Sequence, residues 1–159
     1  MMLHYVHGDL LKSEAKALVN AVNCVGVMGK GIALSFKRKF PENFAAYKLA
    51  CYRRQVHPGK MFVFYSMDLF GNQKIIINFP TKKHWMEKSE LSYINDGLQD
   101  LIAVIGKYHI QSLALPPLGC GNGGLDWYDV KPLIERYLGP VSCDVYVYEP
   151  YGRRHWKNW

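Results

Sequence analysis

Cysteine is scarce in this sequence, and its spacing excludes two classes of small protein. The four cysteines are spread over 159 residues without a C-x-x-C pair. A chain of this length with so few thiols is not a disulfide-stapled scaffold, and its six histidines show no metal-ligand spacing. We therefore predict no structural zinc site and a reducing compartment, the cytoplasm, and we expect that the function described below requires neither a metal nor a cofactor.

Long apolar runs are also lacking. No stretch approaches the roughly 18 consecutive apolar residues that a membrane-spanning helix needs. Residues 1–13 contain no apolar core of signal-peptide length. The 14 glycines and 8 prolines are close to ordinary usage, which argues against a disordered or fibrous chain. We expect a soluble protein that does not engage a membrane.

Positive charge, in contrast, is abundant. The 20 lysine and arginine residues outnumber 13 acidic residues, which gives a formal net charge of +7. This balance favours a polyanionic partner or substrate, although a basic surface often serves only solubility. Because 49% of the 159 residues are hydrophobic, the chain has enough apolar side chains for the core of one domain.

Apolar patterns alternate between the period of a strand and the period of a helix. Short apolar runs predict strands at residues 3–6, 17–22, 61–65, 74–79, 112–115 and 145–148. Helical spacing of apolar residues predicts helices that begin at Gly31, at Pro41, just after Ser89 and just after Asp126. Ser89 and Asp126 are the expected N-caps of the last two. Alternating strands and helices predict an α/β domain in which helices sandwich a mixed, largely parallel sheet.

Two segments concentrate glycine beside predicted helix starts. Residues 26–31 read Gly-Val-Met-Gly-Lys-Gly, and residues 119–124 read Gly-Cys-Gly-Asn-Gly-Gly. Glycine exposes backbone N–H groups without an obstructing Cβ, and a helix N-terminus adds unsatisfied donors, so both segments suit phosphate oxygens. Loops at the carboxyl ends of strands can meet in one crevice of an open α/β sheet. The pattern predicts a ligand that contains a pyrophosphate.

Other interpretations of these segments are weaker or stay open. The spacing Gly29-Lys30-Gly31 is too short for a Walker A loop, and Gly31 stands where Ser or Thr would hold magnesium. Residues 119–124 match G-x-G-x-x-G by letter, but they lie near the end of the chain rather than in a first βα unit. That position argues against a dinucleotide-binding dehydrogenase. Two ordinary tight turns remain the structural alternative.

Four motifs in a fixed order resemble the macrodomain family. They are residues 8–10 (GDL), 17–23 (ALVNAVN), 29–33 (GKGIA) and 117–121 (PLGCG). The resemblance covers residues 2–149, and its finer features are similar to DarG-type macrodomains at residues 23–31, 78–85 and 121–127. It implies a three-layer α/β/α fold with ADP-ribose in a cleft at the crest of the sheet. DarG-type macrodomains are antitoxins that remove ADP-ribose from DNA.

The same resemblance implies where ADP-ribose is held. Asp9 is expected to accept a hydrogen bond from the adenine amino group, beside the backbone of Leu10. Both glycine segments are expected to flank the diphosphate, and Asn20 and Asn23 to contact the distal ribose. A simple turn role for Asp9 and a structural role for Asn20 stay open, because an asparagine inside an apolar strand needs a partner in any case. The predicted binding residues are Gly8, Asp9, Leu10, Asn20, Val22, Asn23, Gly29, Gly31, Ile32, Thr81, Leu118, Gly119, Cys120, Gly121, Asn122 and Gly123.

The resemblance also implies a catalytic lysine. In DarG-type and related lysine-dependent hydrolases the first lysine after the threonine is catalytic, and that position is Lys82. An amine beside an anomeric carbon can attack the opened ribose as a Schiff-base nucleophile or act as an acid–base group. Either role favours a lowered pKa, for which Lys83 and His84 are the candidate neighbouring cations. A solvated basic turn is the alternative interpretation of Lys82 and Lys83.

One feature of the second glycine segment departs from a related human-type hydrolase, which pairs its lysine with an aspartate there. In this sequence no acid occurs before Asp126, which we assign to helix capping. DarG-type proteins likewise have glycine followed by asparagine at this place. What activates water is therefore left open.

The expected function is hydrolysis of ADP-ribose from a modified nucleobase in DNA. The alternatives are a non-catalytic ADP-ribose reader and an ADP-ribose 1″-phosphate phosphatase. We expect a macrodomain over residues 1–149 and a basic aromatic tail over residues 150–159, whose Arg, Lys and Trp suit single-stranded nucleic acid. The expected partners are ADP-ribose, ADP-ribosylated DNA and a cognate ADP-ribosyltransferase toxin, bound by a monomer.

Overall fold

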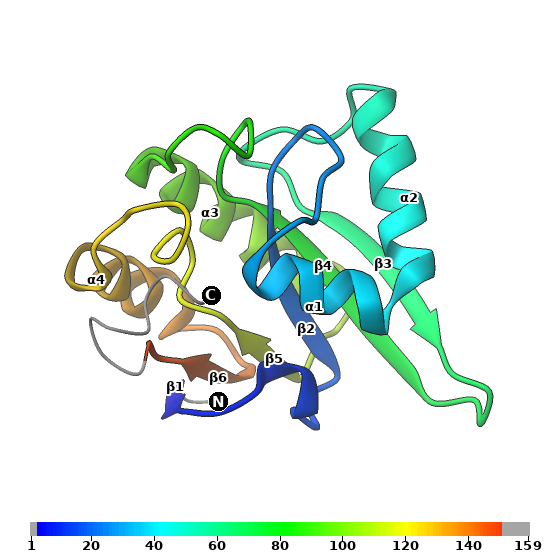
Figure 1. Ribbon diagram of the computed structural model, residues 1–159. Coiled ribbons are helices and arrows are strands. Elements are labelled where there is room, and N and C mark those ends of the chain that lie inside the picture. Colours follow the sequence, from blue (N-terminus) through cyan, green and yellow to red (C-terminus); the bar gives the residue numbers. More distant parts are fainter. Residues whose placement is uncertain (1–2, 151–159) are drawn as a thin grey trace.

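Residues 3–150 are described by a computed structural model in which strands and helices alternate along the chain (Figure 1). The strands are β1 (Leu3–Val6), β2 (Ala17–Val22), β3 (Phe62–Met67), β4 (Gln73–Pro80), β5 (Ser112–Leu115) and β6 (Asp144–Tyr148). The helices are α1 (Gly31–Lys39), α2 (Pro41–Tyr52), α3 (Leu91–Lys107) and α4 (Trp127–Leu138), with a short 3-10 helix, η1, at Leu10–Lys12. The predicted strands and helices are all present, with small shifts of their ends. The predicted basic tail after Pro150 lies outside the described residues.

The strands of the described residues form one sheet in the order β1-β6-β5-β2-β4-β3. Neighbouring strands are parallel except β3, which runs antiparallel to β4 at one edge. Figure 1 shows α1 and α2 on one side of the sheet and α3 and α4 on the other, in agreement with the apolar clusters, one of which joins α3 and α4 to the sheet while two others hold α1 and α2. The prediction of a mixed, largely parallel sheet between helices is confirmed.

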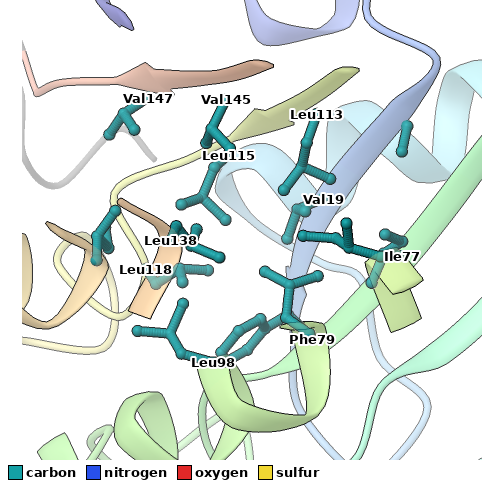
Figure 2. Packing of buried hydrophobic residues seen from close by; sticks show 14 of the residues in the cluster. Val19, Ile77, Phe79, Leu98, Leu113, Leu115, Leu118, Leu138, Val145 and Val147 are labelled. Atoms are coloured by element: carbon teal, nitrogen blue, oxygen red, sulfur yellow. The ribbon is translucent and has the colours of Figure 1, made fainter. Parts of the chain in front are cut away.

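Alternate residues of the central strand β2 pack into opposite layers. Ala17 and Val19 belong to the large apolar cluster with α3 and α4, whereas Leu18 packs on the other face with Phe36 of α1. Figure 2 shows Val19 among side chains that come from β4, β5 and α3. A strand covered on both faces is a nearly continuous apolar run, which is why the sequence predicted it.

Within residues 3–150, no helix is both long and apolar enough to span a bilayer.

The N-terminus of α3 differs from the prediction. Glu90 is the N-cap residue, and Ser89 is buried under residues 119–124. The Ser89 N–H donates to the Gly123 carbonyl at 2.9 Å, and its Oγ, which lies close to Gly123, has no hydrogen-bond partner among the described residues. The capping prediction for Ser89 is therefore wrong, because its hydroxyl faces the glycine segment. In α4, the prediction for Asp126 is confirmed, since its Oδ1 accepts the Tyr128 N–H at 2.9 Å.

Three neighbouring strands, β5, β2 and β4, end at the same edge of the sheet because they are parallel. The chain leaves β2 toward α1 on one face and leaves β5 toward α4 on the other (Figure 1). Where connections diverge in this way, an open α/β sheet forms a crevice for ligands. Strand β1 ends at this edge too, on the far side of β6.

Candidate active site

A cleft of about 390 Å³ opens at this edge, between the ends of β2, β4 and β5. Its size lies within the usual range of small-ligand sites. The lining residues come from segments far apart in the sequence: Ala21, Val22, Asn23, Val27, Gly29, Lys30, Ile32, Ala33, Thr81, Lys82, Trp85, Pro116, Pro117, Gly119, Gly121, Asn122 and Gly123. Both glycine segments therefore face one space.

The loop after β2 is shaped by the side chain of Asn23. Its Oδ1 accepts the Val25 N–H at 3.0 Å, and its Nδ2 donates to the Val27 carbonyl at 2.8 Å. The Tyr47 hydroxyl, from α2, lies 2.8 Å from both the Oδ1 and the main-chain oxygen of Asn23. Asn23 therefore fixes the turn that leads to the first glycine segment, in addition to lining the cleft.

Helix α1 begins in one wall of the cleft. Its first residue, Gly31, has a φ of +56°, a left-handed conformation that favours glycine. The first-turn N–H groups of an α-helix have no acceptor within the helix, and the helix dipole makes this end positive. Lys30 precedes the first turn, and Ile32 and Ala33 of that turn line the cleft. This wall suits an anion.

The second glycine segment follows β5 as a tight turn. Leu125 donates its N–H to the Gly119 carbonyl at 2.8 Å, and Gly124 donates to the Gly121 carbonyl at 3.2 Å. Gly119 has a φ of +73°, and a Cβ there would lie 2.7 Å from the Leu125 Cδ1, so glycine is required. Among the described residues, the N–H groups of residues 121–123 meet no protein acceptor. Three main-chain donors therefore stay available in this wall.

Strand β4 brings Lys82 to the third wall. Thr81 donates its N–H to the last residue of β2 at 2.9 Å, and Cys24 donates its N–H to the Lys83 carbonyl at 3.1 Å. These bonds tie the segment after β4 to the loop after β2. The Lys82 Nζ donates to the Trp85 carbonyl at 3.1 Å, and both residues line the cleft.

The surroundings of Lys82 favour its neutral form. Burial lowers the pKa of Lys82, and the positive charge of Lys30 lowers this pKa further. The prediction that Lys83 and His84 supply the neighbouring charge is wrong. Lys83 lies over an aromatic ring of α3, and the His84 ring accepts a main-chain N–H. A lowered pKa increases the fraction of free amine, which is the form that acts as a nucleophile or a base.

The residues predicted for the adenine end lie outside this lining. Asp9 is the N-cap of η1, and its Oδ1 accepts the Leu11 N–H at 3.0 Å. Leu10 is buried in the core, and Gly8 has a φ of +124° in the turn after β1. This turn lies at the same edge of the sheet, beyond β6. Asp9 therefore has the turn role that the sequence left open, and a contact of these residues with adenine stays a prediction.

Asn20, predicted near the distal ribose, is fully buried within the sheet. Its Nδ2 donates to the Asn78 Oδ1, its neighbour on β4, at 3.3 Å. Asn78 in turn exchanges hydrogen bonds with Asn43 of α2. This network joins the sheet to α2, so Asn20 has the structural role that was left open. Its contact with a ligand stays a prediction.

Leu118 and Cys120 alternate with the cleft-lining glycines but face away from them. Both are buried in the apolar cluster that α3 and α4 cover. Burial raises the pKa of the Cys120 thiol to about 12, so this thiol is neutral. Their predicted contacts with a ligand can involve only the main chain. Within residues 3–150, no group of three His, Cys, Asp or Glu side chains is placed to hold a metal ion.

Several lining residues were not among those predicted to bind. They are Ala21, Val27, Lys30, Ala33, Trp85, Pro116 and Pro117. Each lies next to, or within a few residues of, a predicted position, so the motifs marked the right segments. Which side chains of a loop face a cleft depends on loop conformation, and local sequence patterns do not determine that conformation.

Comparison with known proteins agrees with this geometry. The Macro domain family model matches residues 19–134. A DNA ADP-ribosyl glycohydrolase of Mycobacterium tuberculosis is 56% identical over 152 residues, which cover 95% of this chain and 43% of that protein. The chain therefore spans less than half the length of this curated relative.

Solved structures show the same similarity. The macrodomain of Thermus aquaticus DarG superimposes with a TM-score of 0.88 at 50% sequence identity, covering 94% of this chain and 99% of that chain. Thermosipho africanus DarTG in complex with ADP-ribose gives a TM-score of 0.89 at 37% identity, covering 94% of this chain and 42% of that chain. The resemblance predicted from the four motifs is confirmed. The chain belongs to the macrodomain family.

Proposed function

We propose that this macrodomain hydrolyses the bond between ADP-ribose and a nucleobase of DNA, with Lys82 as the reacting group. The observation that carries the proposal is the position of the Lys82 amine in a cleft whose other walls are the two glycine segments. The name DNA ADP-ribosyl glycohydrolase, borne by similar proteins of M. tuberculosis and T. aquaticus, supports it. So does the ADP-ribose complex of the T. africanus protein.

We propose that the cleft holds the diphosphate and the distal ribose of the ligand. In the proposed complex, the diphosphate lies between the N-terminus of α1 and the free amides of residues 121–123, with the charge of Lys30 beside it. The adenosine extends toward residues 8–10, at the end of β1. The distal ribose then lies near Asn23, and its C1″ faces the Lys82 Nζ.

The chemistry requires the free amine of Lys82. In the nucleophilic route, a bond forms between Nζ and C1″, the bond from C1″ to the base breaks, and the base leaves with a proton. Water then displaces the lysine from C1″ and releases ADP-ribose. In the acid–base route, the free amine takes a proton from water, the water oxygen bonds to C1″ while the bond from C1″ to the base breaks, and the resulting ammonium gives the proton to the leaving base. For the nucleophilic route, Asp126 is engaged in capping α4, so we propose that substrate hydroxyl or phosphate oxygens activate the water.

The test is hydrolysis of an oligonucleotide that carries ADP-ribose on a base. The wild type is expected to release ADP-ribose and restore the unmodified oligonucleotide. Lys82→Ala should lose at least about 100-fold in rate, as expected for removal of a nucleophile or an acid–base group, and should keep its calorimetric affinity for ADP-ribose. Lys83→Ala is the matched control, because this neighbouring lysine is exposed and lies over a ring of α3.

Three results would redirect or contradict the proposal. Full activity of Lys82→Ala contradicts the role of the lysine. Tight ADP-ribose binding by the wild type without turnover indicates a non-catalytic reader. Release of inorganic phosphate from ADP-ribose 1″-phosphate, without hydrolysis of the oligonucleotide, indicates a phosphatase.

The partners follow from this activity. We propose DNA that is single-stranded around the modified base, because a base must leave the helical stack to enter a cleft. We also propose a cognate ADP-ribosyltransferase toxin, since a T. africanus relative that is 37% identical is named a fusion of the two DNA-modifying activities. A monomer in the reducing cytoplasm suits the four free thiols, all within the described residues.

A further inference from the structure

A large aromatic side chain stands half exposed at the rim of the cleft. Trp85 lines the cleft, yet 48% of its surface is exposed. Indole is among the largest apolar groups of a protein, and at the edge of a cleft it offers a flat aromatic face on which a ligand ring can stack. Thr81 and Lys82, which precede it by a few residues on the same segment, also line the cleft. The indole is the one large aromatic group in the lining that the structure describes.

The backbone around Trp85 is well fixed. Its indole lies against the imidazole of His84, with ring centroids 5.3 Å apart and an interplanar angle of 31°. His84 Nδ1 accepts the Met86 N–H at 3.1 Å, and its carbonyl accepts the Glu87 N–H at 3.0 Å. These bonds order the backbone of the turn that carries Trp85, and the imidazole of His84 lies against its indole. A platform that is already ordered loses little conformational entropy on binding.

The main chain of Trp85 is also hydrogen-bonded to the proposed reacting group, the amine of Lys82. The Lys82 Nζ donates to the Trp85 carbonyl at 3.1 Å. When C1″ of a substrate reaches Nζ, the group bonded to C1″ on the side away from ADP-ribose must extend past this residue. The walls that hold ADP-ribose come from α1 and residues 119–123, so the leaving group is directed to the rim that Trp85 occupies.

We propose that Trp85 forms a stacking subsite for the nucleobase that leaves. The inference rests on the proposed function and names the chemistry of the leaving group: a flat aromatic heterocycle, not an amino-acid side chain. Stacking between a base and an aromatic side chain tolerates any base and does not require a particular sequence. The same subsite would hold the base outside the stack of its own strand.

The experiment compares three variants on two ligands. Trp85→Leu removes the aromatic face but keeps apolar bulk, Trp85→Phe keeps an aromatic face, and Met86→Ala is the matched control, an exposed apolar neighbour. Each is combined with Lys82→Ala for binding measurements, so that the modified oligonucleotide stays intact. Affinity is measured for ADP-ribose alone and for the ADP-ribosylated oligonucleotide, and turnover is measured in the variants that retain Lys82.

Trp85→Leu is expected to weaken binding of the modified oligonucleotide by about 10- to 100-fold, the usual effect of losing one stacked base. Its affinity for ADP-ribose should match that of Met86→Ala, and Trp85→Phe should recover most of the loss. Equal affinity of Trp85→Leu and Met86→Ala for the oligonucleotide overturns the inference. An equal loss for both ligands also overturns it, because the indole would then contact ADP-ribose. If the wild type neither binds ADP-ribose nor acts on the oligonucleotide, the proposed function itself fails.

Discussion

The reactivity assigned to Lys82 comes from its surroundings in space rather than from its neighbours in the chain. Its amine is partly buried in the cleft wall, and its pKa is lowered by that burial and by the charge of Lys30. Lys30 belongs to the loop before α1, and Lys82 follows β4. The two lysines meet because β2 and β4 are adjacent and parallel. The positive charge of Lys30 therefore disfavours the ammonium form of Lys82.

A pH profile tests this arrangement. The activity requires the free amine, so kcat/KM is expected to rise with pH through the pKa of Lys82, which lies below the ordinary lysine value. Lys30→Met removes the repulsion, raises the pKa of Lys82 and moves the rising limb to higher pH. Lys83→Met should leave the limb in place. A limb that Lys30→Met leaves unmoved or moves to lower pH contradicts the assigned coupling.

The sequence pointed to Lys82 as the candidate reacting residue, but not to the neighbour that lowers its pKa. The motif that begins at Thr81 marked Lys82 through a family resemblance, whereas the candidate cations were chosen by proximity in the chain. Side chains next to each other after a strand end point in different directions, and Lys83 and His84 accordingly find other partners. The hydrogen bonds that the Asn23 side chain makes within its own loop are supported by the Tyr47 hydroxyl of α2. A local motif does not contain this contact.

The elements are fixed by close packing at particular positions, and α3 on β4 is the clearest case. Gly97 of α3 packs on the ring of Phe79, a fully buried residue of β4, and a Cβ at this glycine would overlap the ring. Gly106 belongs to the same helix, and a Cβ there would meet no atom within 4 Å. An added methyl group is therefore expected to destabilise the fold at Gly97 but not at Gly106.

Urea denaturation of two alanine variants measures this difference. Gly97→Ala is expected to lower the free energy of unfolding by about 1–3 kcal/mol, the usual cost of overpacking a well-filled core. Gly106→Ala should raise this free energy by up to about 1 kcal/mol, because alanine is the better helix former and has open space here. Equal effects of the two substitutions would show that the contact with Phe79 does not determine how closely α3 approaches the sheet.

Most elements were predictable because their apolar patterns record their burial. The strand at residues 17–22 is covered on both faces and is a nearly continuous apolar run, whereas α3 presents an apolar stripe of helical period to the sheet. The N-terminus of α3 was predicted less well. Ser89 has the chemistry of an N-cap, but its position is determined by packing under residues 119–124, which lie far along the chain.

At the scale of the whole molecule, the site results from strand order. β5, β2 and β4 are neighbours although they are far apart in sequence, and the chain leaves β2 and β5 toward opposite faces (Figure 1). The local patterns predicted the class of fold and both glycine segments. They do not contain the strand order, and it is the strand order that brings the two segments to one cleft.

The central claim is that main-chain amides from the two glycine segments surround one diphosphate, and an NMR titration of the ¹⁵N-labelled protein with ADP-ribose tests it most directly. We predict that the amide signals of residues 29–33 and 121–123 shift together with a single affinity. Those of residues 68–72, in the hairpin at the opposite end of β4, should stay in place. Adenosine, which lacks phosphates, should leave both glycine segments unchanged. Saturable ADP-ribose binding that leaves these two sets of amides unperturbed would contradict the account.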